Sequence, residues 1–125
     1  MGQPIVYVDI SEIRAGKQEQ LEAAMDHIAR FVEARMSRVA SYAFFVDEER
    51  RTMSVVAVHP DSESLEFHLD EGNEEFRKFG ELIDLSRIEV YGGVSDGVRE
   101  RLERKARMLG RGTVTLHEFQ AGFAR

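Results

Sequence analysis

Residues 55–79 read VVAVHPDSESLEFHLDEGNEEFRKF, and this stretch decides the expected fold. It begins with four apolar residues, 55–58, three of them β-branched, a composition typical of a strand. Pro60 and Asp61 then mark the start of a helix, with Asp61 or Ser62 as its N-cap. The inner stripe of that helix holds Leu65, His68 and Leu69. The stretch therefore predicts a strand that leads into a helix whose inner face carries a histidine.

The flanking segments complete a β-α-β-β-α-β order. The link at residues 47–51 is charged and too short for a parallel crossover, so the strands on either side of it are antiparallel neighbours. We expect strands at 4–10, 38–46, 52–58 and 86–94, and helices at 17–36, from 60 to a break at 72–73, and at 74–83. This order predicts the α+β class and a ferredoxin-like antiparallel sheet with its helices on one face.

Side chains of the first strand alternate between two faces. We expect Val6, Val8 and Ile10 to face a core, because all three are aliphatic. Tyr7 and Asp9 share the opposite face, and a carboxylate there suggests a partly wet surface or the lining of a cleft.

The strand at 38–46 presents bulky apolar residues to both faces of the sheet. One face carries Tyr42, Phe44 and Val46, and the other carries Val39 and Phe45. Because helices cover only one face of a ferredoxin-like sheet, the second face needs another cover. We therefore expect a homodimer whose two sheets pack face to face.

Residues 95–125 extend the ferredoxin-like domain of residues 1–94. Ser95 or Asp96 caps a helix that has an apolar stripe and a terminal glycine: Val98, Leu102, Ala106, Leu109 and Gly110. Residues 113–119 then read as a fifth strand. We expect this extension to pack on its own domain or on the dimer mate, and its strand to join either its own sheet or the partner's.

Composition limits the class of protein. The chain has 125 residues, 42% of them hydrophobic and 32% charged, which suits one compact domain. It has no cysteine, which excludes disulfides, thiolate catalysis and cysteine-based metal sites. It shows no secretory leader and no apolar run near the roughly 18 residues of a membrane span. We therefore expect a cytoplasmic protein without a membrane partner.

Charge is unevenly distributed along the chain. The formal net charge is −6, yet residues 96–125 hold 7 Lys and Arg against 4 Asp and Glu. The acidic remainder argues against a nucleic-acid partner, because binding to phosphate backbones needs a net basic surface. The basic segment is either a solvated helix face that docks on an acidic surface of the protein or of its dimer mate, or a dedicated anion site.

The order of aromatic residues and histidines resembles a known family. A strand with Tyr42-Ala43-Phe44, a hairpin, a strand ending at His59-Pro60-Asp61 and a helix with Leu65-Glu66-Phe67-His68-Leu69 are similar to the antibiotic biosynthesis monooxygenase-like family of dimeric α/β barrels. The resemblance covers about residues 4–94. It implies a homodimer whose sheets form a barrel, with a pocket between sheet and helices. Members include cofactor-independent oxygenases of aromatic or quinol substrates, haem-degrading enzymes and proteins of unassigned activity.

The chain departs from the family pattern just before the second helix. The family usually has glutamate and then tryptophan where this chain has Ala57 and His59, and the chain contains no tryptophan. Haem-degrading relatives combine an asparagine in the first strand, a tryptophan and a helix histidine, whereas the sole asparagine here is Asn73. Haem degradation is therefore disfavoured, and we expect no cofactor. The extension after residue 94 has no counterpart in the minimal family pattern, so it closes or reshapes the pocket.

His68 is the candidate catalytic residue. As a base it would take a proton from a phenol or hydroquinone, and the electron-rich anion would react with dioxygen. Alternatively the ring is structural, held by a backbone carbonyl or by Tyr42. We expect the substrate-binding residues to be Tyr7, Asp9, Tyr42, Phe44 and His59.

Two functions follow from these candidates. The first is a cofactor-independent monooxygenase of a small aromatic or quinol-like substrate. The second is a noncatalytic dimeric barrel that binds a small apolar ligand or a protein partner, with its pocket open or filled by the extension through Phe119 or Phe123. We expect no metal, because His59, His68, His117 and Asp9 lie on separate elements without a short-range ligand spacing.

Overall fold

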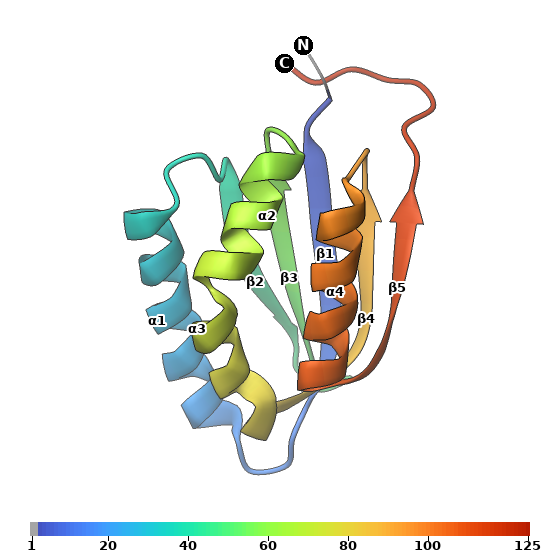
Figure 1. The fold of residues 1–125 in the computed structure, drawn as a ribbon. Helices are drawn as coiled ribbons and strands as arrows, with labels where there is room; N and C mark the ends of the chain where they lie inside the picture. Colours follow the sequence, from blue (N-terminus) through green and yellow to red (C-terminus); the bar gives the residue numbers. More distant parts are fainter. Residues whose placement is uncertain (1–2) are drawn as a thin grey trace.

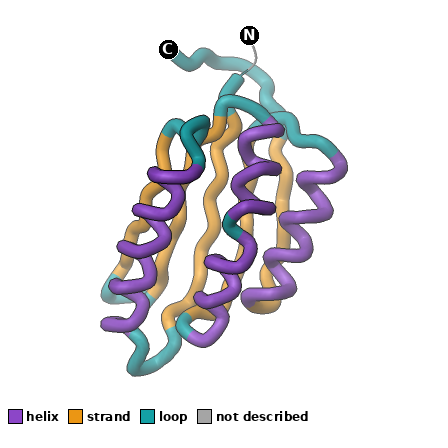
Figure 2. Tube along the Cα trace, turned by 60° about the vertical axis from the view of Figure 1, so that its left-hand side comes forward, coloured by secondary structure: helices purple, strands orange, loops and turns teal. Residues whose placement is uncertain are grey.

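The computed structural model describes residues 3–125, which form one sheet covered on one side by a layer of helices (Figures 1 and 2). Its strands are β1 (Ile5–Ile13), β2 (Ser41–Asp47), β3 (Thr52–His59), β4 (Ile83–Tyr91) and β5 (Gly110–His117). Its helices are α1 (Gln18–Arg35), α2 (Ser62–Glu71), α3 (Asn73–Arg77) and α4 (Asp96–Leu109), with a 3-10 turn η1 at Lys78–Glu81. The α+β class and the β-α-β-β-α-β order are confirmed.

The strand order across the sheet is β2-β3-β1-β4-β5. The first four strands pair antiparallel in the ferredoxin-like arrangement. β5 pairs parallel to β4, and α4 makes the crossover that a parallel connection requires. Of the two places expected for the last strand, it occupies the edge of its own sheet. The extension is thus continuous with the first domain.

The predicted boundary between the second helix region and the fourth strand is wrong. The sequence pattern predicted a helix to residue 83 and a strand at 86–94, whereas β4 runs from Ile83 to Tyr91. The reason is the length of β1, which continues to Ile13 and pairs with Ile83 at that end. A backbone that completes a ladder of hydrogen bonds takes precedence over a weak helical spacing.

The helices begin where the sequence places their caps. The Asp61 side chain accepts a hydrogen bond from the Ser64 amide at 2.9 Å, and Ser95 accepts one from the Val98 amide at 3.2 Å. Gly72 separates α2 from α3, as expected. Among residues 3–125, no helix combines the length and apolarity needed to cross a membrane.

Gly110 links α4 to β5 for a reason other than the expected helix cap. Its φ of 165° is extended, so it does not adopt the left-handed conformation of a typical C-terminal glycine. A Cβ at this position would lie 2.6 Å from both the amide nitrogen and the carbonyl oxygen of Leu85. Glycine is therefore required by the close approach of β5 to β4.

The faces of β1 are reversed from the expectation. Ile5, Tyr7 and Asp9 are buried beneath the helices, and Val6, Val8 and Ile10 lie half-buried on the open face. A carboxylate is tolerated on the inner face because polar partners from β1 and α4 surround it, as described below. The aliphatic side chains instead contribute to the open face.

The open face of the sheet is largely apolar over β2, β3 and β1. Strand register places Val58 and Val56 of β3 beside Val6 and Val8 of β1. On the other side of β3, Ala43 lies beside Val56, and Phe45 lies beside Ser54. Phe45 has 57% of its surface exposed. Over β4 and β5 the same face becomes polar, with Arg87, Glu89 and His117. β2 presents apolar residues to both faces, as expected, but Val39, expected on the same face as Phe45, precedes the strand and packs against the core.

Candidate functional site

Three polar side chains meet in the core between the helices and the sheet. Tyr7 and Asp9 come from the inner face of β1, and Lys105 comes from α4. The Tyr7 hydroxyl donates a hydrogen bond to Oδ2 of Asp9. Lys105 Nζ donates to the Tyr7 hydroxyl at 2.8 Å and lies 3.6 Å from Oδ2 of Asp9. All three are buried, so they form an ion pair bridged by a phenol inside the protein.

Aromatic rings complete the surroundings of the lysine. Lys105 Nζ lies 4.2 Å from the centre of the Phe76 ring and 4.8 Å from that of Tyr7. A cation over an aromatic face is attracted by the ring's electron density, and the attraction is stronger away from water. The position of Lys105 is therefore set by one carboxylate, one hydroxyl and two rings.

Sequence reasoning missed Lys105, although a signal for it was present. Lys105 falls on the apolar stripe of α4, three residues after Leu102 and four before Leu109. A lysine within such a stripe is rarely buried unless it has a partner. The charge on the stripe, together with a lone aspartate in β1, could have predicted the pair.

A small cavity opens beside this ion pair. It has a volume of about 20 Å³ and is lined mainly by apolar side chains: Asp9, Tyr42, Phe44, Met53, Val55, Phe76, Phe79, Ile83, Leu85, Lys105 and Leu109. This space holds about one water-sized molecule. Oδ1 of Asp9 is buried and makes no hydrogen bond of ordinary geometry among the described residues, although the backbone N–H of Val55 lies close enough to the carboxyl to lower its pKa. Asp9 and Lys105 are thus the charged residues in a mostly apolar wall.

Two histidines lie in the same core, and His68 contacts the aromatic wall of the cavity through Tyr42 and Phe76. The His59 Nδ1 lies 2.9 Å from the Ser64 hydroxyl oxygen, and the His68 Nδ1 lies 3.0 Å from Sδ of Met36. The His68 ring centre is 5.3 Å from that of Tyr42. Neither histidine lines the cavity, and each Nε2 is buried without a partner in the described part of the chain. His59, which as a strand-end residue could have been exposed, is fully buried.

Burial shifts the pKa of each group in this core. It raises the pKa of the Asp9 carboxyl, against the opposing effect of the Lys105 charge. It lowers the pKa of Lys105, against the opposing charge of Asp9. Burial and then the Lys105 charge lower the pKa of His59 to about 4 and that of His68 well below its usual value. Both histidines are therefore neutral at neutral pH.

The low pKa of His59 predicts a loss of stability in acid. In the unfolded chain this histidine titrates near pH 6.5, whereas in the folded protein it titrates near pH 4. Between these values the unfolded state binds a proton that the folded state does not, so stability falls as the pH falls. The free energy of unfolding should decrease by about 1.4 kcal/mol per pH unit from this group, or about 2–3 kcal/mol from pH 6.5 to 4.5.

Urea unfolding across that pH range measures this contribution. His59→Asn should show a shallower pH dependence than the wild type, because the titrating group is gone. His27→Asn serves as the control, since His27 is 63% exposed in its side chain and pairs with Glu75 at the surface. Equal slopes for the wild type and His59→Asn would contradict the assignment.

The structure brings the candidate site residues into one region of the core, but only some of them line the cavity. Asp9, Tyr42 and Phe44 line it directly. Tyr7, His59 and His68 lie within the adjoining core and line no part of it. Phe119 and Phe123 are 49% and 75% exposed, so the C-terminal segment does not fill the cavity. Within residues 3–125, no three histidine, aspartate or glutamate side chains form a group that could hold a metal ion.

Comparisons with known proteins identify relatives by structure alone. No family model and no curated protein sequence matches the chain. Among solved structures, MupZ from Pseudomonas fluorescens superimposes with a TM-score of 0.73 at 20% identity, covering 100% of this chain and 91% of MupZ. A "putative antibiotic biosynthesis monooxygenase" from Deinococcus radiodurans superimposes with a TM-score of 0.61 at 14% identity, covering 73% of this chain and 93% of that protein. The chain has the fold of the antibiotic biosynthesis monooxygenase-like proteins.

These solved structures differ in how much of the chain they match. Protein SO0527 from Shewanella oneidensis, with a TM-score of 0.62 and 25% identity, covers 73% of this chain and is itself 91% covered. The Deinococcus and Shewanella proteins thus leave about a quarter of the chain unmatched, the fraction that residues 95–125 make up. The MupZ match includes this fraction, so an extension of this length is not peculiar to the present chain. The monooxygenase-like fold was correctly expected from the sequence.

Proposed function

We propose that this protein is a cofactor-independent monooxygenase of a small aromatic or quinol-like substrate, with Asp9 as the base. The observation that carries the proposal is Oδ1 of Asp9, a buried acceptor that makes no hydrogen bond of ordinary geometry among the described residues, in a mostly apolar wall next to a buried lysine. A carboxylate whose pKa is raised by burial is a stronger base than one in water. A phenolic hydroxyl of the substrate donates its proton to this oxygen.

The chemistry after proton removal needs no external reductant. A hydroquinone and dioxygen give a hydroxyquinone and water, so one oxygen atom enters the substrate ring, the other leaves as water, and the substrate supplies the electrons. The anion formed at Asp9 is the species that donates electrons to dioxygen. The charge of Lys105, held by Tyr7 and Phe76, stabilises negative charge that develops on the substrate or on reduced oxygen.

Asp9 is favoured over His68 as the base by position. His68 has a buried and unpartnered Nε2, but it is separated from the cavity by Tyr42 and Phe76, which line it. In this proposal His68 is a positioning residue that packs against Tyr42. His59 lies one ring further, with its ring centre 5.2 Å from that of His68.

Substrate entry requires aromatic side chains to move. The cavity holds about one water, whereas small-molecule sites usually have volumes of roughly 300 Å³ or more. Phe44 and Phe79 both line the cavity, and their rings stack with centres 6.0 Å apart. Separation of these two rings, which come from β2 and η1, would enlarge the space beside Asp9.

Oxygen uptake with a panel of hydroquinones and phenols tests the proposal. Wild-type protein should consume oxygen with at least one member, with a hydroxylated quinone as product. His68→Ala should reduce the rate only modestly, because His68 acts through Tyr42. If every substrate is inert, the monooxygenase proposal fails.

A noncatalytic binding protein is the second candidate. Its support is the mostly apolar lining of the cavity, which suits a small apolar ligand once Phe44 and Phe79 have separated. The two candidates differ in the panel experiment, because a binding protein would shift its aromatic signals on addition of ligand without consuming oxygen.

We propose that the open sheet face forms a homodimer. Its support is the largely apolar surface over β2, β3 and β1, interrupted by Ser41 and Ser54, which the helices of the same chain do not cover (Figure 2). Light scattering coupled to size-exclusion chromatography should give twice the 14.3 kDa chain mass at micromolar concentration. Phe45→Lys, which adds a charge to this face, should give a larger monomer fraction. A wild-type monomer at micromolar concentration would contradict the proposal.

A further inference from the structure

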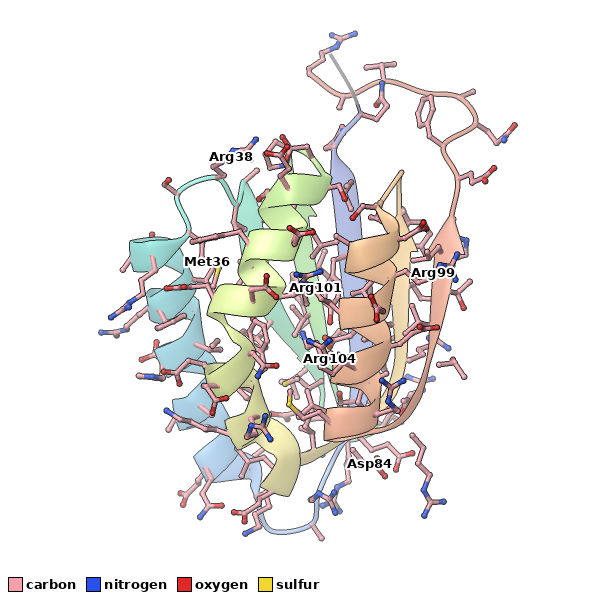
Figure 3. The ribbon with its side chains drawn as sticks, viewed as in Figure 1. Met36, Arg38, Asp84, Arg99, Arg101 and Arg104 are labelled. Atoms are coloured by element: carbon pink, nitrogen blue, oxygen red, sulfur yellow. The ribbon has the colours of Figure 1, made fainter. Side chains whose placement is uncertain are left out.

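A second pocket lies on the outer side of Lys105, between α4 and the α2–α3 segment. Its volume is about 190 Å³, and its lining is mostly polar: Leu69, Asp70, Asn73, Arg101, Arg104 and Lys105. Among the described residues, Lys105 alone lines both this groove and the inner cavity beside Asp9. Figure 3 shows Arg101 and Arg104 on the side of α4 that faces α2 and α3, with Arg99 on the opposite side, toward β5.

Arg101 is already committed to neighbouring groups. Its Nε donates to Oδ1 of Asp70 at 2.7 Å, and its Nη1 donates to the Gly97 carbonyl oxygen at 2.9 Å. Glu66 lies 3.6 Å from the same guanidinium. These contacts hold Arg101 against α2 and neutralise much of its positive charge. Such pairing is expected of a basic helix face that packs on an acidic surface.

Arg104 is different, since it makes no ion pair among residues 3–125. Within the groove, Arg101, Arg104 and Lys105 provide three positive charges against the single carboxylate of Asp70. Lys105 is paired with Asp9 from the inner side, and Arg101 is paired with both Asp70 and Glu66. Arg104 is therefore the cation of the groove that no carboxylate of the described residues pairs with, and it shares the groove with Asn73 and the buried Lys105.

We propose that this groove binds a small oxyanion, a carboxylate or phosphate group, through the Arg104 guanidinium and the Asn73 amide. A guanidinium presents paired donors that match both groups, and the prepositioned Arg101 adds to the positive field. In this proposal the basic C-terminal segment forms an anion site, which is one of the two roles that the sequence left open for it. Where this inference rests on the proposed monooxygenase function, the bound oxyanion is an acidic group carried by the aromatic substrate. Oxyanion binding itself requires no turnover.

The test is a titration of the full chain followed by backbone amide NMR at constant ionic strength in chloride. The probes are sodium benzoate, sodium acetate, inorganic phosphate and, as a neutral match for benzoate, benzyl alcohol. At least one anion should shift the amides of Asn73 and Arg104 saturably, whereas benzyl alcohol should leave them in place. Arg104→Gln should weaken that binding about tenfold or more, and Arg99→Gln, a matched change on the far side of α4, should leave it unchanged.

The probes distinguish the source of the oxyanion. Tighter binding of benzoate than of acetate or phosphate identifies an acidic group on an aromatic ligand, and tighter binding of phosphate identifies a phosphate group. No saturable shift with any anion, or equal weakening by Arg104→Gln and Arg99→Gln, would overturn the proposal. Saturable binding of an anion together with inert hydroquinones would refute the monooxygenase function and leave the anion site standing.

Discussion

Lys105→Met should lower the free energy of unfolding by about 3–5 kcal/mol. The substitution keeps the length and apolar stem of the side chain, so little packing volume is lost. It removes the cation that lies 3.6 Å from Oδ2 of Asp9, and the carboxylate is then left buried with only the Tyr7 hydroxyl as partner. Urea unfolding at neutral pH and fixed protein concentration measures the change.

A double-mutant cycle separates the free energy of the Asp9–Lys105 interaction from the effects of each substitution on the surrounding residues. Asp9→Asn removes the charge of the partner, and Asp9→Asn combined with Lys105→Met should recover much of the stability that Lys105→Met loses, because no isolated charge remains. Met108→Leu, on the same helix, is a control for changes in packing, since Met108 is only partly buried. A stability of Lys105→Met within about 1 kcal/mol of the wild type would contradict a charged buried pair.

Asp9→Asn should reduce the rate of oxygen uptake by about 100-fold or more. General base catalysis contributes about 10²–10⁴-fold, and an amide cannot accept the substrate proton. His68→Ala should reduce the rate by less than tenfold, since His68 does not line the cavity. Asp84→Asn is the matched control, because Asp84 is an exposed carboxylate near the start of β4 that does not line the cavity (Figure 3).

The comparison of these variants must use folded protein. Asp9→Asn leaves Lys105 without its counter-charge, which can destabilise the protein. Far-ultraviolet circular dichroism must therefore first show that the variant has the wild-type spectrum and is folded. If the folded Asp9→Asn variant keeps the wild-type rate while His68→Ala loses it, the base is His68 and the role given to Asp9 is wrong.

The sequence predicted the fold well because its elements carry local signals. Asp61 and Ser95 mark helix starts, and Gly72 marks the break between α2 and α3, all through interactions within a few residues. The end of the second helix region was missed because Ile83 belongs to a ladder with Ile13, a partner 70 residues away. Pairing at that range leaves no trace in local spacing.

The candidate site was only partly predictable for the same reason. Tyr42, Phe44 and Asp9 were identified and do line the cavity. The face of β1 was assigned wrongly because alternation identifies two faces without saying which one the helices cover. Lys105 belongs to the extension, beyond the residues that carry the family resemblance, and its contact with Asp9 spans almost the whole chain. The centre of the site therefore moves from His68 to the pair formed by Asp9 and Lys105.

A crystal structure with a bound, unreactive phenol tests this centre most directly. We expect a phenol hydroxyl within hydrogen-bond distance of Oδ1 of Asp9 and the phenol ring among Tyr42, Phe44 and Phe79. The Phe44 and Phe79 rings should have moved apart. A phenol bound instead on the open face of the sheet, or hydrogen-bonded to Nε2 of His68 with Asp9 untouched, would contradict this expectation.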